Sequence, residues 1–234
     1  MLILALDSTA VVASVALCED DRALAAFHLN NGNTHSETLL PMVKAALDTT
    51  GHSVDDIDLF ACSVGPGSFT GVRIGAATVK GLAFGKEKPV IGVSTLEALA
   101  TNLLPFEGLI VPVMNARRGQ VYNAVFEAKN GVLQRITPDR ALAVTELEAE
   151  LAAIGRPFAL CGDGADMTAA LLVSLRPVAI SPLLTAQNAV SVAAVARRMY
   201  ENGVRTTDAE LTPVYLRLPQ AERERLEREK QNPN

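Results

Sequence analysis

Polar residues that could bind a phosphate and a metal ion follow the first apolar run of the sequence. Residues 2–6 read as a buried strand, and Asp7, Ser8 and Thr9 come directly after it. An open α/β sheet places its ligands at the carboxyl ends of its strands, where a carboxylate and two hydroxyls could hold hydrated Mg²⁺ and a phosphate. Asp and Ser are also common turn formers. From these residues alone, a ligand site and a polar turn are equally supported.

A second candidate is the glycine elbow, the turn at Gly65 and Gly67 between an apolar run at residues 57–64 and a predicted helix at residues 68–84. Ser68 can cap that helix by accepting a bond from a backbone N–H. A strand, a glycine turn and a helix N-terminus together form a ready anion site. The elbow therefore either binds a phosphate or lets two segments pack closely.

The spacing of the elbow favours packing. Thr70 stands where a Rossmann motif has its third glycine, and Val72 rather than Lys follows Gly71, so the P-loop motif fails as well. A related turn, Gly162-Asp163-Gly164, follows a second apolar run at residues 158–161. Asp163 is the one further acid expected to face a cleft shared with Asp7. Asp7 alone is a certain carboxylate of this site, which is a thin basis for metal-assisted phosphoryl transfer.

The remaining reactive side chains form no catalytic set. Cys18, Cys62 and Cys161 lie far apart in apolar runs with no Cys-x-x-Cys pair, which predicts buried structural thiols in a reducing compartment. No two histidines have metal-ligand spacing, and His35 is expected to be a surface or interface residue. No serine lies in a Gly-x-Ser-x-Gly elbow.

Composition bounds the class of protein. A chain of 234 residues that is 49% hydrophobic can bury a sizeable core in two lobes or small domains. Its net charge of -5 should repel nucleic acid overall, although a local basic patch stays open. The apolar start is interrupted by Asp7 with no basic segment before it, and no apolar run reaches the length of a membrane span. We expect a cytoplasmic protein without a membrane contact.

The order of predicted elements repeats, which indicates an internal duplication. Each half reads as three strands, a helix, a strand, a glycine turn and a helix. In the first half these are residues 2–6, 11–17, 23–29, 34–47, 57–64 and 68–84, followed by a strand at 90–93 and a helix at 94–99. In the second half they are residues 109–114, 120–127, 132–137, 145–153, 158–161 and a helix from 167, followed by a helix at 186–201. The two helices of residues 34–47 and 145–153 each begin at a predicted capping box, at Thr34 and Thr145.

This order predicts an α/β fold of two lobes, each with a mixed sheet flanked by helices. The expected first lobe spans residues 1–104 and carries the docking helices. The expected second lobe spans residues 105–219, with its last segment free to return to the first lobe. A charged tail at residues 220–234 follows.

Two helix faces in the first half are apolar or unusually small. The helix at 34–47 carries Leu39, Leu40, Val43 and Leu47, and the helix at 68–84 carries Gly71, Gly75, Thr78 and Leu82. Such faces are either simple core or a helix docking surface for another subunit. The residues alone leave both interpretations open.

Several motifs, in order along nearly the whole chain, resemble the bacterial TsaB family, also called YeaZ. They are Val-Gly-Pro-Gly-Ser-Phe-Thr-Gly-Val-Arg-Ile-Gly at 64–75, Leu-Ala-Leu-Asp-Ser-Thr at 4–9, His-Ser-Glu-x-Leu-Leu-Pro at 35–41, Ile-Gly-Val-Ser-Thr-Leu at 91–96, Ala-Arg at 116–117 with Val-Tyr at 121–122, and Pro-Val-Tyr-Leu-Arg at 213–217.

The resemblance implies a duplicated actin-like ATPase fold (the ASKHA class, RNase H-like). It implies a role in making N6-threonylcarbamoyladenosine at adenosine 37 of tRNAs that read codons beginning with A. In that family a paralogous subunit, TsaD, transfers the threonylcarbamoyl group, TsaB binds and supports TsaD, and an ATPase, TsaE, joins them. The resemblance further implies a homodimer when the chain is alone, contact with tRNA only through the complex, and no intrinsic cofactor beyond weak ATP or ADP binding.

Two departures from the related patterns argue against catalysis by this chain. The paralogue's His-Met-Glu-Gly-His metal motif corresponds to Thr-Leu-Glu-Ala-Leu at residues 95–99, which lacks both imidazoles, so we expect no metal site. Asn115 stands where the family pattern has Asp. The resemblance therefore predicts a non-catalytic subunit.

These expectations assign residues to two sites and none to catalysis. The predicted partner interface is His35, Leu39, Leu40, Val43, Leu47, Gly71, Gly75, Thr78 and Leu82. The predicted vestigial nucleotide site is Asp7, Ser8, Thr9, Gly65, Gly67, Gly162 and Asp163. A Gly75→Arg variant is expected to abolish association while leaving the monomer folded. The competing functions are a stand-alone actin-like ATPase or sugar-kinase-like phosphotransferase and, less favoured, a peptidase.

Overall fold

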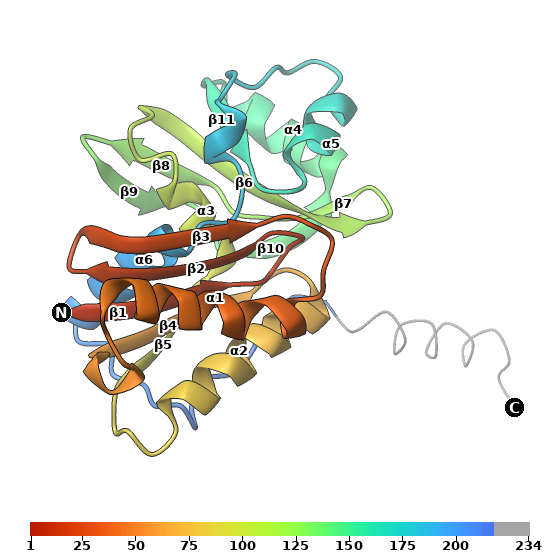
Figure 1. Ribbon diagram of the computed structural model, residues 1–234. Helices are drawn as coiled ribbons and strands as arrows, with labels where there is room; N and C mark the ends of the chain where they lie inside the picture. The colour runs from red at the N-terminus through yellow and green to blue at the C-terminus, as the bar shows by residue number, and fades with distance from the viewer. Residues whose placement is uncertain (218–234) are drawn as a thin grey trace, which may run out of the picture.

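The computed structural model describes residues 1–217, which form two lobes (Figure 1). The charged tail expected at residues 220–234 lies outside the described residues. Among the described residues, none of the helices combines the length and the hydrophobicity that a bilayer crossing requires.

The first lobe is built on a five-stranded mixed sheet in the order β3-β2-β1-β4-β5. Its strands are β1 (Leu2–Asp7), β2 (Ala13–Glu19), β3 (Arg22–Leu29), β4 (Leu59–Gly65) and β5 (Val90–Ser94). β1 pairs antiparallel with β2 and parallel with β4. Every residue of β1 and β4 is buried, as expected for central strands that are covered on both faces.

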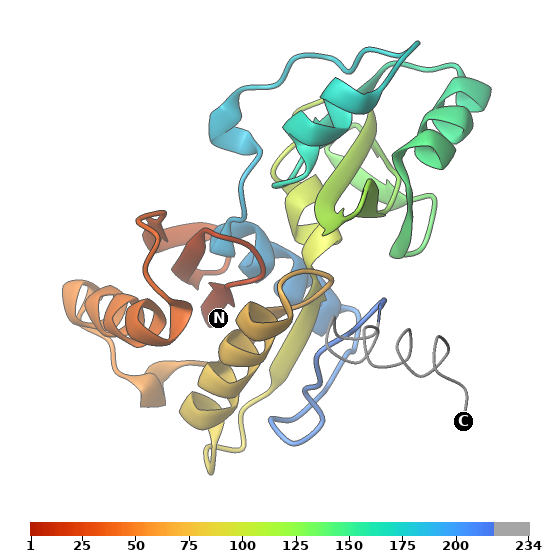
Figure 2. The same ribbon diagram turned by 90° about the vertical axis from the view of Figure 1, so that its right-hand side faces the viewer.

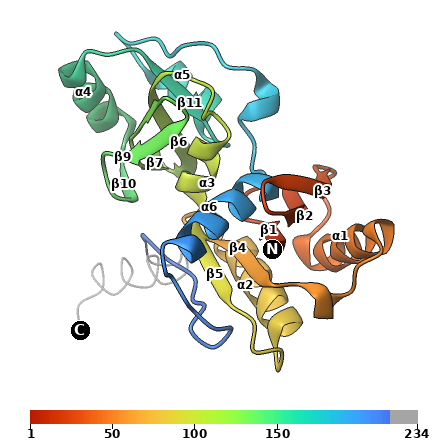
Figure 3. The ribbon, with the colours of Figure 1, turned by 90° about the vertical axis from the view of Figure 1, so that its left-hand side faces the viewer.

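Helices cover both faces of this sheet. On one face, α1 (His35–Thr50) and α2 (Phe69–Ala83) pack on a core that includes Leu4 and Leu6. On the other, α6 (Ala189–Glu201) packs on a core that includes Ile3 and Ala5 (Figure 3). The helix α3 (Thr95–Thr101) leads into the second lobe, and a short 3₁₀ turn, η1 (Val54–Asp56), follows α1. Successive side chains of β1 thus point alternately into the two hydrophobic cores on opposite faces of the sheet.

The second lobe repeats this plan around β6 (Gly108–Arg117). β6 pairs antiparallel with β7 (Gln120–Asn123) and parallel with β11 (Phe158–Cys161), as β1 does with β2 and β4. The other strands are β8 (Phe126–Lys129), β9 (Val132–Arg135) and β10 (Arg140–Ala143). α4 (Val144–Ile154), α5 (Ala165–Leu171) and the 3₁₀ turn η2 (Pro182–Leu184) complete the lobe. The predicted α/β fold of two duplicated lobes, each with a mixed sheet flanked by helices, is confirmed.

Several predicted boundaries in the second lobe are wrong. The single strand expected at residues 120–127 is two strands, β7 and β8, which pair with successive parts of β6. The strand is interrupted at Val125 because the backbone of Val125 bonds to Ile136 and Thr137 instead of to β6. β10 was not predicted, and the cap expected at Thr145 lies at Ala143, whose backbone N–H donates to Glu146 at 2.8 Å.

The end of the described chain returns to the first lobe. The segment that follows α6 makes two backbone hydrogen bonds to strands of the first lobe. The carbonyl oxygen of Thr206 accepts from the N–H of Val90 at 2.9 Å, and the N–H of Val214 donates to the carbonyl oxygen of Val64 at 2.7 Å. The extended segment at residues 213–217 therefore lies beside β4, next to the glycine elbow. The first lobe is built from two separate stretches of the chain.

Candidate functional sites: a closed glycine elbow and an open helix groove

The glycine elbow has the helix cap that the sequence predicts, but its amide is already occupied. Ser68 Oγ accepts a hydrogen bond from the backbone N–H of Gly71 at 3.2 Å. The backbone N–H of Ser68 donates to the carbonyl oxygen of Thr9 at 2.7 Å. An anion at the start of α2 would have to displace this carbonyl.

The glycines of the elbow are required by close approach of the chain to itself. A Cβ placed on Gly71 would lie 2.0 Å from the carbonyl oxygen of Ser8, and one on Gly67 would lie 2.5 Å from that of Thr9. A Cβ on Gly65, which has a φ of +116°, would lie 2.4 Å from the carbonyl oxygen of Val214. The β1–β2 turn and the returning segment thus pack directly against the glycine elbow.

Asp7 is enclosed and accepts three hydrogen bonds. Its side chain is 1% exposed. Ser63 Oγ donates to Oδ2 at 2.5 Å, while the backbone N–H and the hydroxyl of Thr9 donate to Oδ1 at 2.9 and 2.8 Å. Burial raises the pKa of Asp7 above its ordinary value, and the bonds from Ser63 and Thr9 oppose that rise. This geometry is that of a structural turn.

The glycine turn of the second lobe is packed in the same way. A Cβ on Gly162 would lie 2.3 Å from the carbonyl oxygen of Val113, and the backbone N–H of Gly164 donates to that oxygen at 3.1 Å. Asp163 is solvent-exposed and accepts from the backbone N–H of Asn115 at 3.3 Å. Partial desolvation, with a smaller contribution from the charge of Asp7, raises the pKa of Asp163. The two acids expected to share a cleft therefore interact, but only Asp163 is open to solvent.

His35 stabilises the start of α1. Its Nε2 lies 2.7 Å from the carbonyl oxygen of Ala10, so Nε2–H is the donor. Nδ1 is buried without a hydrogen-bond partner among the described residues. The imidazole also lies against α2, since a Cβ on Gly71 would lie 3.3 Å from its Cδ2. It is a half-buried packing residue rather than part of an exposed face.

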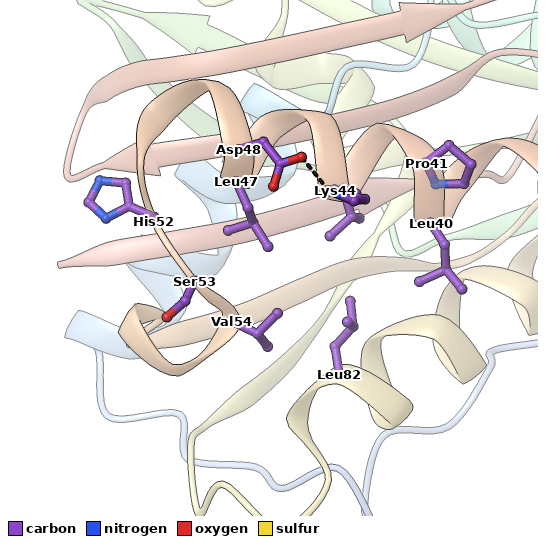
Figure 4. Close-up of a pocket in the computed structure, with 10 residues that line it drawn as sticks. Leu40, Pro41, Lys44, Leu47, Asp48, His52, Ser53, Val54 and Leu82 are labelled. Atoms are coloured by element: carbon purple, nitrogen blue, oxygen red, sulfur yellow. Dashed lines mark hydrogen bonds and ion pairs between the residues drawn. The ribbon is translucent and has the colours of Figure 1, made fainter.

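The open site in this lobe is an apolar groove between α1 and α2 (Figure 4), with a volume of about 700 Å³. Leu40 and Leu47 extend from α1, and Leu82 extends toward them from α2. Lys44 and Asp48 pair at 2.5 Å on the rim. The lining is completed by Pro41, Val43, His52, Ser53 and Val54.

The groove separates the predicted interface residues into two groups. Leu40, Val43, Leu47 and Leu82 line it, and Leu40 is 54% exposed. The other predicted residues do not line it: His35, Leu39, Gly71, Gly75 and Thr78.

The glycine face of α2 packs on the β1–β2 turn of the same chain. Gly71 and Gly75 are buried against Ser8, and a Cβ on Gly75 would lie 2.5 Å from Ser8 Oγ. A side chain at Gly75 would press on Ser8 of the same chain, so whether Gly75→Arg leaves the monomer folded stays a prediction. Leu39 is 1% exposed in the core, and the Thr78 hydroxyl donates to Ile74 at 2.8 Å.

Sequence reasoning missed part of the groove. Pro41 was not among the predicted interface residues, yet α1 continues through it and its exposed ring lines the groove. Val54 lies on η1, which was not predicted, and it closes the far end. The signal available in the sequence was the Leu40-Pro41 pair, which is apolar although Leu39 and Val43 already supply the inward face of the helix.

The sulfur chemistry agrees with the prediction of buried thiols. All three cysteines are free and buried. Burial raises the pKa of Cys18 to about 11 and that of Cys62 to about 12, and it raises the pKa of Cys161 further. Thiolates are thus disfavoured at neutral pH. Within residues 1–217, no group of three or more His, Cys, Asp or Glu side chains is placed to hold a metal ion.

Comparison with known proteins identifies the family. The family model of TsaD, tRNA N6-adenosine threonylcarbamoyltransferase, matches residues 30–223. The tRNA threonylcarbamoyladenosine biosynthesis protein TsaB of Bacillus subtilis is 32% identical over 98% of this chain and 100% of its own length. The chain belongs to the TsaB family. TsaB of Escherichia coli is 43% identical over 56% of this chain and 58% of its own length.

Solved structures agree with this assignment. YeaZ from Pseudomonas aeruginosa superposes with a TM-score of 0.78 and 29% identity, covering 92% of this chain and 99% of that one. A crystal structure described as an uncharacterized Pseudomonas aeruginosa protein with similarity to peptidase YEAZ gives a TM-score of 0.81 at 30% identity over the same shares. The protein therefore acts in the biosynthesis of threonylcarbamoyladenosine in tRNA.

Proposed function

We propose that this protein is a non-catalytic subunit that binds TsaD, the catalytic threonylcarbamoyltransferase, through the α1–α2 groove. The observation that carries the proposal is the groove itself, because it leaves Leu40 exposed and Leu82 half-buried between two helices of an otherwise well-packed lobe. An apolar groove between helices suits a helical partner, which would bury these side chains by ridges-into-grooves packing.

The closed glycine elbow favours a non-catalytic, supporting subunit over an independent phosphotransferase. A nucleotide needs free amides at the elbow and an accessible carboxylate for Mg²⁺. Here Ser68 N–H is bonded to Thr9, and Asp7 is enclosed. The competing ATPase or sugar-kinase-like function thus requires the β1–β2 turn to move away. Calorimetry of the isolated chain with Mg-ATP tests this: tight binding would favour the competitor.

The proposal extends to the assembly that this family's pattern implies. TsaD would modify adenosine 37 of tRNAs reading codons that begin with A, and TsaE would join the complex. The isolated chain would form a homodimer through the same groove, because a second copy offers the same exposed leucines. Any ATP or ADP would bind weakly, or only within the complex.

Introducing negative charges into the groove tests the docking surface. We expect Leu40→Asp with Leu82→Asp to weaken TsaD binding by at least about thirtyfold, because hot-spot truncations cost about 2 kcal/mol or more. The matched control is Val132→Asp, since Val132 is 66% exposed on β9 of the other lobe. Binding is measured by calorimetry or size-exclusion chromatography, with thermal unfolding as a check on the fold. Unchanged TsaD binding by the folded groove variant would refute the assignment.

The activity test is reconstitution of tRNA modification with purified TsaD, with and without this chain. We expect threonylcarbamoyladenosine to form only when the chain is present, and to be lost with the groove variant but kept with Val132→Asp. Sedimentation of the chain alone tests the homodimer, because the groove variant should be monomeric. A dimer that survives Leu40→Asp would place self-association on another face.

A further inference from the structure

A row of arginine and aromatic side chains crosses the junction of the two lobes. Arg73 of α2 lies 5.2 Å from the ring centroid of Phe69, and the rings of Phe69 and Tyr215 are 4.7 Å apart. Two residues further on, Arg217 donates to the carbonyl oxygen of Ala116 at 2.8 Å. Arg117 follows at the β6–β7 hairpin. We call Arg73, Phe69, Tyr215, Arg217 and Arg117 the junction row.

The junction row joins three segments that are far apart in the sequence. The start of α2, the end of the described chain and the β6–β7 hairpin converge between the lobes (Figure 2). The contacts above link each segment to the next. Arg73, Arg117 and Tyr215 are exposed, Phe69 is 36% exposed and Arg217 is half-buried, so the row faces solvent along most of its length.

The arginines of the row differ from most others in the protein because no described carboxylate neutralises them. Elsewhere, carboxylates pair with Arg22, Arg135, Arg140, Arg156, Arg197 and Arg198. Within residues 1–217, Arg73 contacts the Phe69 ring, Arg217 contacts a carbonyl and Arg117 makes no ion pair. In a chain of net charge -5, this leaves a local positive strip.

Backbone conformation at the hairpin points the same way. Arg117 and Arg118 have φ values of +64° and +55°, followed by Gly119 at +69°. This left-handed region favours Gly and Asn and disfavours long side chains. Two arginines therefore occupy the hairpin tip despite a local conformation that disfavours long side chains.

We propose that the junction row binds RNA, with guanidinium groups on phosphates and the Phe69–Tyr215 pair stacked on an exposed base. Guanidinium matches phosphate geometry with paired hydrogen bonds, and aromatic rings beside arginines are the usual platform for unpaired bases. This inference rests on the proposed function, within which the RNA is the tRNA substrate of the complex. The acidic remainder of the chain makes the contact weak unless TsaD holds the tRNA nearby.

Removal of charge from the row tests the proposal in the complex with TsaD. The test variant is Arg73→Gln with Arg117→Asn, since Asn tolerates the left-handed backbone. The control is Arg22→Gln with Arg156→Gln, which changes net charge equally at two ion-paired positions. We measure the affinity of each complex for a tRNA transcript by fluorescence anisotropy over a range of salt concentrations.

The expected result is an affinity about tenfold weaker for the test variant, with a salt slope shallower by about two, because each substituted arginine leaves one phosphate without its cation. The control should change affinity less than about twofold. Photo-crosslinking of a thiouridine-labelled tRNA should label the peptides that contain Phe69 or Tyr215. Unchanged affinity and slope, or crosslinks absent from both peptides, would overturn the proposal.

Two further outcomes separate this inference from the proposed function. If the test variant loses TsaD rather than tRNA, the row contacts protein and the RNA assignment is wrong. If the wild-type chain does not bind TsaD at all, the proposed function fails by itself. The same variants and crosslinks, measured on the isolated chain at low salt, then decide the RNA contact independently.

Discussion

The glycine elbow and the α1–α2 groove share helix α2, but the chain fills one and leaves the other open. At the elbow, Ser8 and Thr9 contact α2 so closely that a single added carbon on Gly71 would overlap a carbonyl oxygen. At the groove, exposed Leu40 and half-buried Leu82 line an open volume of about 700 Å³. The two regions differ because one pairs α2 with the chain's own β1–β2 turn and the other leaves helix surfaces unpartnered.

This comparison separates two meanings of small or apolar helix residues. Small residues show where backbones approach closely, but they do not show which backbone approaches. In this protein the close neighbour of Gly71 and Gly75 is the β1–β2 turn of the same chain. An assembly surface is instead indicated by large apolar side chains that remain exposed. Variants in each region should therefore affect different measurements: stability for the elbow and association for the groove.

The largest effect is expected from Gly71→Ala. Overpacking usually costs about 1–3 kcal/mol, and this substitution should exceed that range because its Cβ would lie 2.0 Å from a backbone oxygen that cannot rotate away. The matched control is Gly81→Ala on the same helix, where a Cβ meets nothing within 4 Å. That change should stabilise the protein by about 0.5–1 kcal/mol through helix propensity. Urea denaturation measures both.

Equal stability of the two alanine variants would break the comparison, because the elbow would then be able to open and accommodate a side chain. Such an elbow could also admit a ligand. Calorimetry with Mg-ATP on Gly71→Ala would then show whether the opened turn binds nucleotide.

Two adjacent leucines give the next largest effect. Leu39→Ala should lower the free energy of unfolding by about 2–5 kcal/mol, since Leu39 is buried at 1% exposure. Leu40→Ala should change it by less than about 0.5 kcal/mol, because Leu40 is 54% exposed. Binding to TsaD should show the reverse order. If Leu40→Ala destabilised the isolated monomer as much as Leu39→Ala, the groove would be closed in solution.

Much of the fold was predictable from the sequence because its local signals agree with its tertiary contacts. The apolar runs of β1 and β4 and the Ser68 cap of α2 lie as predicted. In the second lobe, strand propensity at residues 120–127 was overridden by the contacts of Val125 with Ile136 and Thr137, which no local pattern encodes. The cap of α4 was misplaced by two residues because Glu146, rather than Glu148, bonds the helix start.

The candidate sites were less predictable because they depend on contacts between distant segments. Gly65 and Val214 are far apart in the sequence, so spacing could not show that the returning segment closes the elbow. The junction row likewise needs the contact of Tyr215 with Phe69. The basic pair Arg197 and Arg198 is likewise neutralised by Asp21, Glu201 and Glu97, two of which lie far away in the sequence.

A smaller effect is expected at the bond that closes the first turn. Ser63→Ala removes the donor to Asp7 Oδ2 and should cost about 1.5–3 kcal/mol while Asp7 is ionised. The bond lowers the pKa of Asp7 against the rise caused by burial. Its loss should therefore raise that pKa further, so the destabilisation should grow as pH rises through the pKa of Asp7 and shrink below it. Denaturation from pH 4 to pH 8 checks this; a constant difference would mean that Asp7 does not titrate in this range.

The smallest effect concerns Asp163, which faces solvent at the corresponding turn of the second lobe. Its pKa is raised in the folded state by desolvation and by the charge of Asp7, so its contribution to stability is present below about pH 3.8 and lost as pH rises through the raised pKa. Asp163→Asn keeps an oxygen for the Asn115 N–H and removes the charge. The variant should be more stable than wild type by a few tenths of a kcal/mol at pH 7, because solvent screens a partly exposed charge, and equal to it near pH 3. A larger gain would mean that the second turn is as enclosed as the first, and the contrast between Asp7 and Asp163 would be lost.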